Sequence, residues 1–154
     1  MQGRDKDVYY LQMASHLSQM ATCPRRKVGC ILLDGFGHII GTGYNGNARG
    51  LAHCSDEEPC DGVHARSGED LDKCEAIHAE QNALLQCHDV MRIESVYCTT
   101  QPCPHCMKML INTSAKRIIY AEPYAKSAAL VRKLAEKRDI ELIELPLPAI
   151  AIQV

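Results

Sequence analysis

Helical and strand patterns alternate three times in the second half of the chain, and this alternation restricts the fold more than any other feature. Strands joined through helices pair in parallel, which predicts an α/β domain built in layers. In chain order the predicted elements are a helix at about 77–87, the strand SVYCTT (95–100), a helix opening after Pro104, the strand KRIIYAE (116–122), a helix at 127–138 and the strand IELIEL (140–145).

The first 44 residues predict one helix and a β-hairpin. Runs VGCILL (28–33) and HIIGTGY (38–44) flank a Gly-rich turn, so these two strands pair antiparallel and the whole sheet is mixed. The helix is predicted over about 5–21, from one face of apolar side chains spaced three or four residues apart: Tyr10, Met13, Leu17 and Met20.

We expect a single domain over residues 1–154, interrupted at about 46–76 by an irregular insertion rich in Cys and His. The N-terminal sequence MQGRDKDVYY lacks an apolar stretch, which argues against a signal peptide or a membrane span. The expected location is the cytoplasm, or the host cytoplasm if the chain is viral. A net charge of -2 with one Phe and no Trp argues against a nucleic acid polymer as partner.

Nine cysteines are many for a reducing compartment, where such density indicates metal binding or catalysis before disulfides. Cys30 and Cys98 lie in apolar runs and Cys87 in a helical pattern, so these three are predicted to be small core residues. The remaining six need another explanation.

Two short motifs indicate the chemistry: His78-Ala79-Glu80, and Pro102-Cys103-Pro104-His105-Cys106. A lone His near a helix start is often structural, and a lone C-x-x-C can be redox-active or structural. Together, with one predicted strand between them, they match the H-x-E and P-C-x-x-C signature of zinc deaminases.

Cys103 and Cys106 are three residues apart, so on a first helical turn both thiolates can bind one zinc ion at about 2.3 Å. His78 supplies a third ligand, and the fourth tetrahedral position stays open for water. Glu80 is then the general base and acid, provided that the helix approaches the metal end-on. Otherwise Glu80 is only an acid at a helix N-terminus.

Besides the insertion, the informative segments are CPRRKVG (23–29), GYNG (43–46), IHAEQNAL (77–84) and QPCPHC (101–106). Together they resemble the cytidine deaminase superfamily and, within it, the deoxycytidylate (dCMP) deaminases. The resemblance covers about residues 5–145 and implies a three-layer α/β/α fold with a mixed five-stranded sheet. It further implies a hexamer that converts dCMP to dUMP and ammonia for dTMP synthesis, activated by dCTP and inhibited by dTTP.

The resemblance also implies residue roles. Asn45 would contact the sugar or base, the N–H of Ala79 the pyrimidine carbonyl, and Tyr124 the 5'-phosphate. The effector site would be formed in part by Gly43, Tyr44, Asn45 and Gly46, and Mg²⁺ could accompany a triphosphate bound there. Alternatively, these four residues are only the end of a strand followed by an Asn-Gly turn. The basic run Arg25, Arg26 and Lys27 either binds phosphate, with Arg26 as the substrate ligand, or is a solvated charge run.

Some dCMP deaminases hold a structural zinc in a similar insertion, which suggests a second ion here. The preferred ligands are Cys23, Cys54, Cys60 and Cys74, with His53 or His64 as substitutes. Their spacings match no compact zinc finger, so free or redox-active thiols remain the alternative.

Three other functions stay open. The first is a deaminase acting on dCTP, cytidine or a nucleic-acid base, and the second is a non-catalytic zinc module. The third is a thiol-redox protein using Cys103 and Cys106, in which His78 and Glu80 would have no role.

Overall fold

The computed structural model describes residues 5–55, 57–66 and 68–147, so the two ends of the predicted 1–154 domain lie outside the described residues. All predicted α-helices and strands occur in the predicted order, and within the described ranges three short 3₁₀ helices (η) that the sequence did not predict lie between them. The observed elements are α1 (Lys6–Ser18), β1 (Gly29–Asp34), β2 (Ile39–Tyr44), η1 (Leu71–Lys73), α2 (Ala79–Gln86), η2 (Val90–Arg92), β3 (Ile93–Thr100), α3 (Pro104–Leu110), β4 (Arg117–Glu122), η3 (Ala125–Ser127), α4 (Ala128–Lys137) and β5 (Glu141–Glu144).

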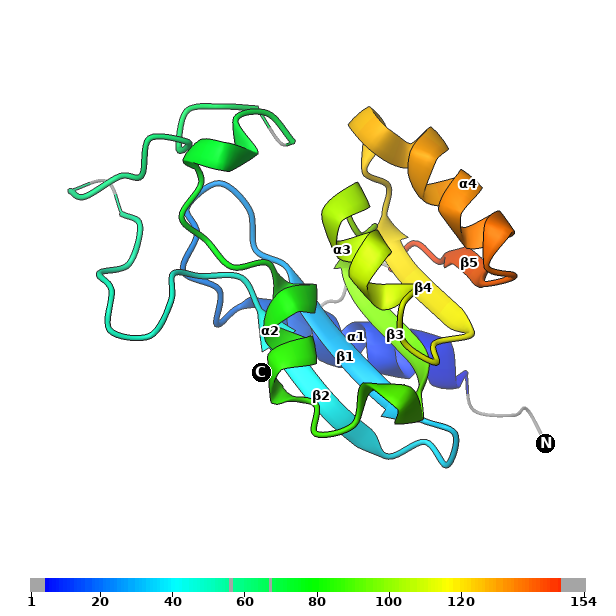
Figure 1. Ribbon diagram of the computed structural model, residues 1–154. Coiled ribbons are helices and arrows are strands. Elements are labelled where there is room, and N and C mark those ends of the chain that lie inside the picture. Colours follow the sequence, from blue (N-terminus) through cyan, green and yellow to red (C-terminus); the bar gives the residue numbers. More distant parts are fainter. Residues whose placement is uncertain (1–4, 56, 67, 148–154) are drawn as a thin grey trace.

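All five strands form one mixed sheet in the order β2-β1-β3-β4-β5. β1 pairs antiparallel with β2 and also with β3, whereas β3, β4 and β5 are parallel. The predicted antiparallel hairpin and parallel C-terminal half are therefore confirmed (Figure 1).

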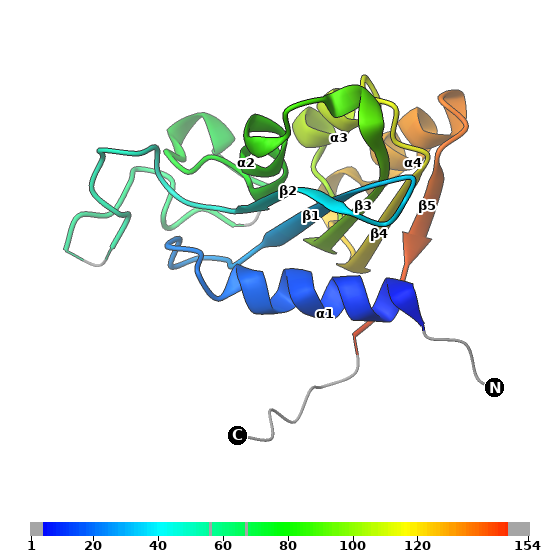
Figure 2. The same cartoon turned by 90° about the horizontal axis from the view of Figure 1, so that it is seen from below.

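Helices cover both faces of the sheet, which confirms the three-layer α/β/α architecture. Figure 2 shows α1 on one face and α2, α3 and α4 on the other. Two apolar clusters fill the space between the sheet and the helices, one on each face of the sheet. Because both of its faces are covered, β1 is buried along its whole length. Cys30 and Cys98 are fully buried, as predicted, whereas Cys87 is only half-buried.

The predicted apolar face of α1 is partly wrong. Leu11 and Ala14 are its most buried residues, while Tyr10, Met13 and Leu17 flank them half-buried. Met20 lies after the helix and is 62% exposed. The helix ends earlier than predicted, so the last position of the spaced series leaves the buried face.

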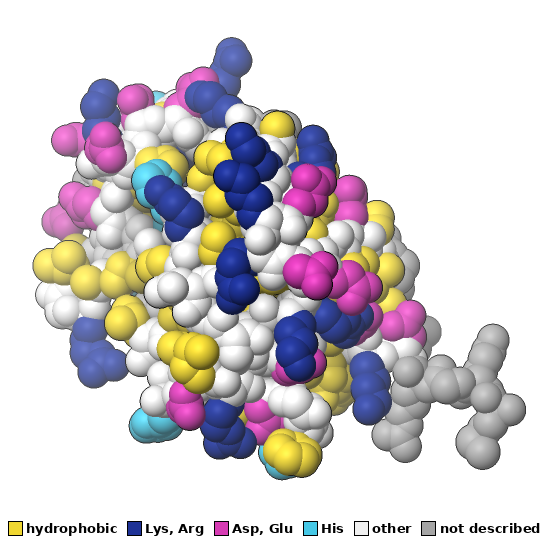
Figure 3. Space-filling view, turned by 45° about the vertical axis from the view of Figure 1, so that its right-hand side comes forward, with side chains coloured by type: hydrophobic (Ala, Val, Ile, Leu, Met, Phe, Trp, Pro, Cys, Tyr) yellow, Lys and Arg dark blue, Asp and Glu magenta, His cyan; other side chains and the backbone are white. Residues whose placement is uncertain are grey.

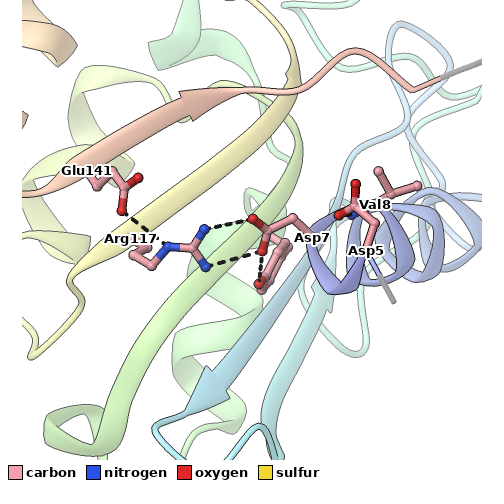
Figure 4. Close-up of polar contacts among 6 residues, drawn as sticks. Asp5, Asp7, Val8, Arg117 and Glu141 are labelled. Carbon is pink, nitrogen blue, oxygen red and sulfur yellow. Dashed lines mark hydrogen bonds and ion pairs between the residues drawn. The ribbon is translucent and has the colours of Figure 1, made fainter. Parts of the chain in front are cut away.

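One ion-pair network fixes the start of α1 to the sheet. Asp5 caps the helix by accepting from the N–H of Val8 at 3.1 Å. Arg117 of β4 donates to both carboxylate oxygens of Asp7, at 3.2 and 2.7 Å, and the hydroxyl of Tyr97 donates to Asp7 at 2.7 Å. The guanidinium also contacts Glu141 of β5, so one arginine links α1 to two strands (Figure 4).

The insertion between β2 and α2 lies beyond one end of the sheet, next to the start of α2 (Figure 1). Its one described helical turn is η1, and the backbones of Gly46 and Ile77 pair at its base. A Cys- and Gly-rich segment without periodicity forms turns rather than longer elements, as its composition predicts.

In the described part of the chain, none of the helices has the length and apolar character needed to cross a membrane.

Candidate active site

Two helices begin at the same place, and each begins at a predicted zinc ligand. His78 is the N-cap residue of α2, and Cys103 is the N-cap residue of α3. The side chain of Gln81 accepts from the N–H of His78 at 2.8 Å, and Pro104 occupies the first turn of α3. Both helices therefore present their N-termini to one point, which is the end-on arrangement expected from the sequence.

His78, Cys103 and Cys106 form a compact donor set. The Nδ1 atom of His78 lies 3.5 Å from Sγ of Cys103 and 3.3 Å from Sγ of Cys106. Among the residues that the structure describes, this is the one group of three or more His, Cys, Asp or Glu whose ligand atoms lie within 4.8 Å of one another. Tetrahedral zinc with two sulfur ligands and one nitrogen ligand would hold these atoms roughly 3.5 Å apart. The donor set therefore fits zinc.

The charges of the three side chains suit a cation. Hydrogen bonds from Cys106 and then His78 lower the pKa of Cys103 to about 4, against burial. The hydrogen bond with Cys103 in turn raises the pKa of His78 and that of Cys106. The site therefore holds a thiolate at neutral pH even with protons on its neighbours, and zinc would displace those protons.

Glu80 lies in the first turn of α2, two residues after His78, and is 4% exposed. Burial raises the pKa of its carboxyl group. A raised pKa brings a carboxyl group closer to the pH at which an enzyme works, which favours a residue that must both accept and donate a proton.

A cavity of about 350 Å³ opens beside this centre. Its lining includes His78, Glu80 and Cys103. The predicted substrate residues also line it: Arg26, Asn45, Ala79 and Tyr124.

Each substrate candidate has a distinct setting. Ala79 is the first residue of α2, where backbone N–H groups have no acceptor inside the helix. Arg26 contacts Glu122 at 3.4 Å. The backbone N–H of Tyr124 donates to the side-chain oxygen of Gln101 at 3.0 Å. Gln101 therefore positions Tyr124, a role that the sequence analysis missed although the residue precedes the Pro-Cys motif.

The GYNG segment is built into the packing around the site. A Cβ on Gly43 would collide with the backbone of α2 at Ala79, and Gly46 pairs with Ile77. The carbonyl of Tyr44 accepts from the side chain of Asn82 at 2.8 Å.

The side chain of Asn45 is committed to the backbone of the segment before β1. Its oxygen accepts from the N–H of Val28 at 2.8 Å, and its nitrogen donates to the carbonyl of Arg26 at 2.8 Å. These contacts give Asn45 a structural task in addition to its place on the cavity wall.

The four cysteines predicted for a second zinc gather in one region. Cys23, Cys54 and Cys60 are buried and Cys74 is half-buried, and Sγ of Cys54 accepts from the N–H of Cys60 at 3.3 Å. Cys54 and Cys74 both lie within electrostatic range of the thiols of Cys23 and Cys60. The proposed substitutes, His53 and His64, are exposed.

Comparisons with known proteins agree with this geometry. Residues 4–122 match the family model of the cytidine and deoxycytidylate deaminase zinc-binding region. The chain is 37% identical to the deoxycytidylate deaminase of Schizosaccharomyces pombe over 122 residues, which are 77% of this chain and 37% of that protein. It is therefore much shorter than that relative. It is 34% identical to the deoxycytidylate deaminase of Mycobacterium phage D29 over 126 residues, which are 78% of this chain and 97% of that protein.

The fold also has a counterpart among solved structures. The dCMP deaminase of cyanophage S-TIM5, in complex with dCMP and dUMP, superposes with a TM-score of 0.73 at 24% identity. The match covers 94% of this chain and 100% of that one. At this identity the likeness concerns the fold.

Proposed function

The chain belongs to the cytidine and deoxycytidylate deaminase family, and we propose that it hydrolyses dCMP to dUMP and ammonia. The proposal rests on one observation above all. His78, Cys103 and Cys106 converge at two helix N-termini, directly beside the buried carboxyl group of Glu80. The substrate is taken from the deoxycytidylate deaminases that the chain resembles, in particular the phage relative of similar length.

His78, Cys103 and Cys106 would hold the zinc ion, which supplies Lewis acidity that eases deprotonation of the attacking water. Glu80 accepts a proton from that water and delivers it to the ring nitrogen next to the amino-bearing carbon. Glu80 then takes the second proton from the hydroxyl group added to that carbon and transfers it to the amino group as the carbon–nitrogen bond breaks, which leaves a carbonyl on the ring and releases ammonia. Water and dCMP are thereby converted to dUMP and ammonia, and Glu80 returns to its starting state.

The cavity residues bind and orient the nucleotide in this proposal. The N–H of Ala79, at the positive end of α2, donates to the pyrimidine carbonyl. Asn45 contacts the sugar while its amide holds the segment before β1. Tyr124 and Arg26 lie on the cavity wall where they can bind the 5'-phosphate.

Regulation and cellular role follow from the resemblance. We propose a cytoplasmic homohexamer that supplies dUMP for dTMP synthesis, with dCTP as activator and dTTP as inhibitor at a site involving residues 43–46. Mg²⁺ would accompany the bound triphosphate. Opposite responses of dCMP turnover to dCTP and dTTP would support this regulation, and identical responses would contradict it.

A structural zinc is proposed at Cys23, Cys54, Cys60 and Cys74. Buried thiols in a polar loop that lacks an apolar core support the proposal, because a metal replaces the missing packing energy. Two zinc ions per chain are expected in a fully loaded sample. Loss of one ion in Cys54→Ser with dCMP turnover retained would support the site, and a single ion in the wild type would contradict it.

Substrate selection separates dCMP from the alternatives. The face drawn in Figure 3 carries a row of Lys and Arg side chains with Asp and Glu beside it, so charges of both signs share that face rather than the single sign that favours nucleic acid. The test compares the loss of ultraviolet absorbance for dCMP, dCTP, deoxycytidine and a cytosine-containing oligonucleotide. Preferred turnover of dCMP is expected, and preferred turnover of another compound would reassign the substrate.

A further inference from the structure

Part of the insertion forms a wall of the active-site cavity. We call this part the strap and define it as residues 62–66 and 68–74. Its backbone is closed by a hydrogen bond from the N–H of Gly62 to the carbonyl of Lys73 at 3.1 Å. Ala65, Gly68 and Leu71 of the strap line the same cavity as Glu80 and the zinc ligands. The position of the strap therefore determines the shape of the space open to substrate.

Arg25 holds the strap from the segment that leads into β1. Its Nη1 donates to the carbonyl of Gly62 and its Nη2 donates to the carbonyl of Arg66, both at 2.7 Å. The planar guanidinium matches two separate acceptors, which the single ammonium of a lysine does not. The charge of Arg25 is thus directed at the strap, 37 and 41 positions further along the chain.

A second attachment holds the strap from the other side of the cavity. Lys126 of η3 contacts the carboxylate of Glu69 at 2.9 Å. Gly68, with a φ of +84°, lies against the ring and hydroxyl of Tyr124, and a Cβ there would collide with that hydroxyl. The strap is therefore attached to the segment before β1 and to the segment before α4.

We propose that Arg25 is a positioning residue, which holds the strap against the cavity and so sets the affinity for the cytosine nucleotide rather than the rate of the chemical step. This inference rests on the proposed deaminase function. It separates Arg25 from Arg26 within the basic run: Arg25 acts through the strap, whereas Arg26 is the phosphate candidate. The zinc ligands and Glu80 come from α2 and α3, which Arg25 does not hold, so their geometry remains intact when Arg25 is replaced.

The test uses zinc-loaded full-length protein and the variants Arg25→Ala and Arg25→Lys, with Arg49→Ala as an exposed arginine of the same insertion for control. Arg25→Ala should raise KM for dCMP and for deoxycytidine by the same factor, about 10-fold, because two charge-assisted hydrogen bonds are lost. Its kcat should stay within about threefold of wild type. Amide hydrogen exchange of the strap should become faster, with Arg25→Lys intermediate and Arg49→Ala unchanged.

Two results would overturn the proposal. A loss confined to dCMP, with deoxycytidine unaffected, would make Arg25 a direct phosphate ligand. Unchanged exchange of the strap in Arg25→Ala would remove the attachment itself. Lys126→Gln releases the other side of the strap, so it should reproduce the rise in KM even if Arg25→Ala fails to fold.

Failure of the proposed function is distinguishable from failure of this inference. If the wild type turns over neither compound, the deaminase proposal fails by itself. Hydrogen exchange then still decides on Arg25, because faster exchange in Arg25→Ala supports the attachment and unchanged exchange contradicts it.

Discussion

The Nδ1 atom of His78 lies 3.3 Å from the Sγ atom of Cys106, although the two residues are 28 positions apart in the chain. The contact arises because α2 and α3 both begin at the same end of the sheet. Convergence of helix N-termini brings two thiols and an imidazole together in a region of positive backbone potential, where a thiolate is stabilised.

Removal of the imidazole should weaken zinc binding. His78→Ala takes away one of three protein ligands, so zinc affinity should fall by about 100-fold or more, beyond the loss expected for a residue that only supports a ligand. Metal analysis after dialysis against a weak chelator measures this. His88→Ala, an exposed histidine after α2, should keep the wild-type zinc content. Equal zinc content in the two variants would contradict the assignment.

Glu80→Gln should separate metal binding from catalysis. The amide keeps the size of the side chain but cannot accept the proton, so kcat should fall by about 10²- to 10⁴-fold. Zinc content and KM should change little, because Glu80 is not among the three ligands. Steady-state kinetics with parallel metal analysis checks this, and near-normal kcat would remove Glu80 from the proton path.

Gly43→Ala should destabilise the protein and disturb the site together. The added Cβ would collide with the carbonyl of Ala79, next to Glu80, and with the backbone of Ala83. Such overpacking costs about 1–3 kcal/mol or more. Gly35→Ala is the matched control, because a Cβ there meets no atom within 4 Å. Thermal unfolding should show a lower Tm for Gly43→Ala alone; an equal Tm for both would contradict this packing role.

Asp7→Asn should lower stability in a pH-dependent way. The hydrogen bond from Arg117, reinforced by that from Tyr97 and opposed by burial, holds the pKa of Asp7 below its ordinary value of 3.8. A lowered folded pKa stabilises the protein above the unfolded pKa, and this contribution is lost as pH falls through the folded value.

Because the ion pair is partly exposed, Asp7→Asn should cost about 1–2 kcal/mol at neutral pH. Urea unfolding of both proteins should show a constant difference down to about pH 5 that shrinks below pH 4. A difference that persists unchanged in acid would mean that Asp7 stabilises the fold without its charge.

The sequence was sufficient for the element order and the mixed sheet, because periodicity and turn residues encode these features. The convergence of the two motifs was expected because together they match the signature of zinc deaminases. The sequence did not predict that β1 lies next to β3, since strand neighbours depend on packing between distant segments. Met20 was wrongly predicted on the buried face of α1, because the spacing of apolar residues does not tell where a helix ends.

The contacts that hold the strap at the active site also could not be predicted from the sequence. No local pattern predicts that Arg25 reaches the carbonyls of Gly62 and Arg66, because backbone acceptors carry no sequence signature. For Gly43 and Gly46 the structure adds a packing role to the ligand contact expected from the sequence, because Gly43 lies against α2 and Gly46 pairs with Ile77. Because glycine has no Cβ, either a ligand or a neighbouring helix can lie close to its backbone. The presence of a glycine alone therefore does not tell which of the two is its neighbour.

Deamination by this site is measured most directly as the loss of ultraviolet absorbance when zinc-loaded wild-type protein and Glu80→Gln are each incubated with dCMP, with ammonia measured in the same sample. Wild type should release one ammonia for each dUMP formed, and Glu80→Gln with equal zinc should be slower by at least about 100-fold. Absence of turnover by the zinc-loaded wild type, with dCTP added or omitted, would contradict the assignment of this site as a deaminase centre.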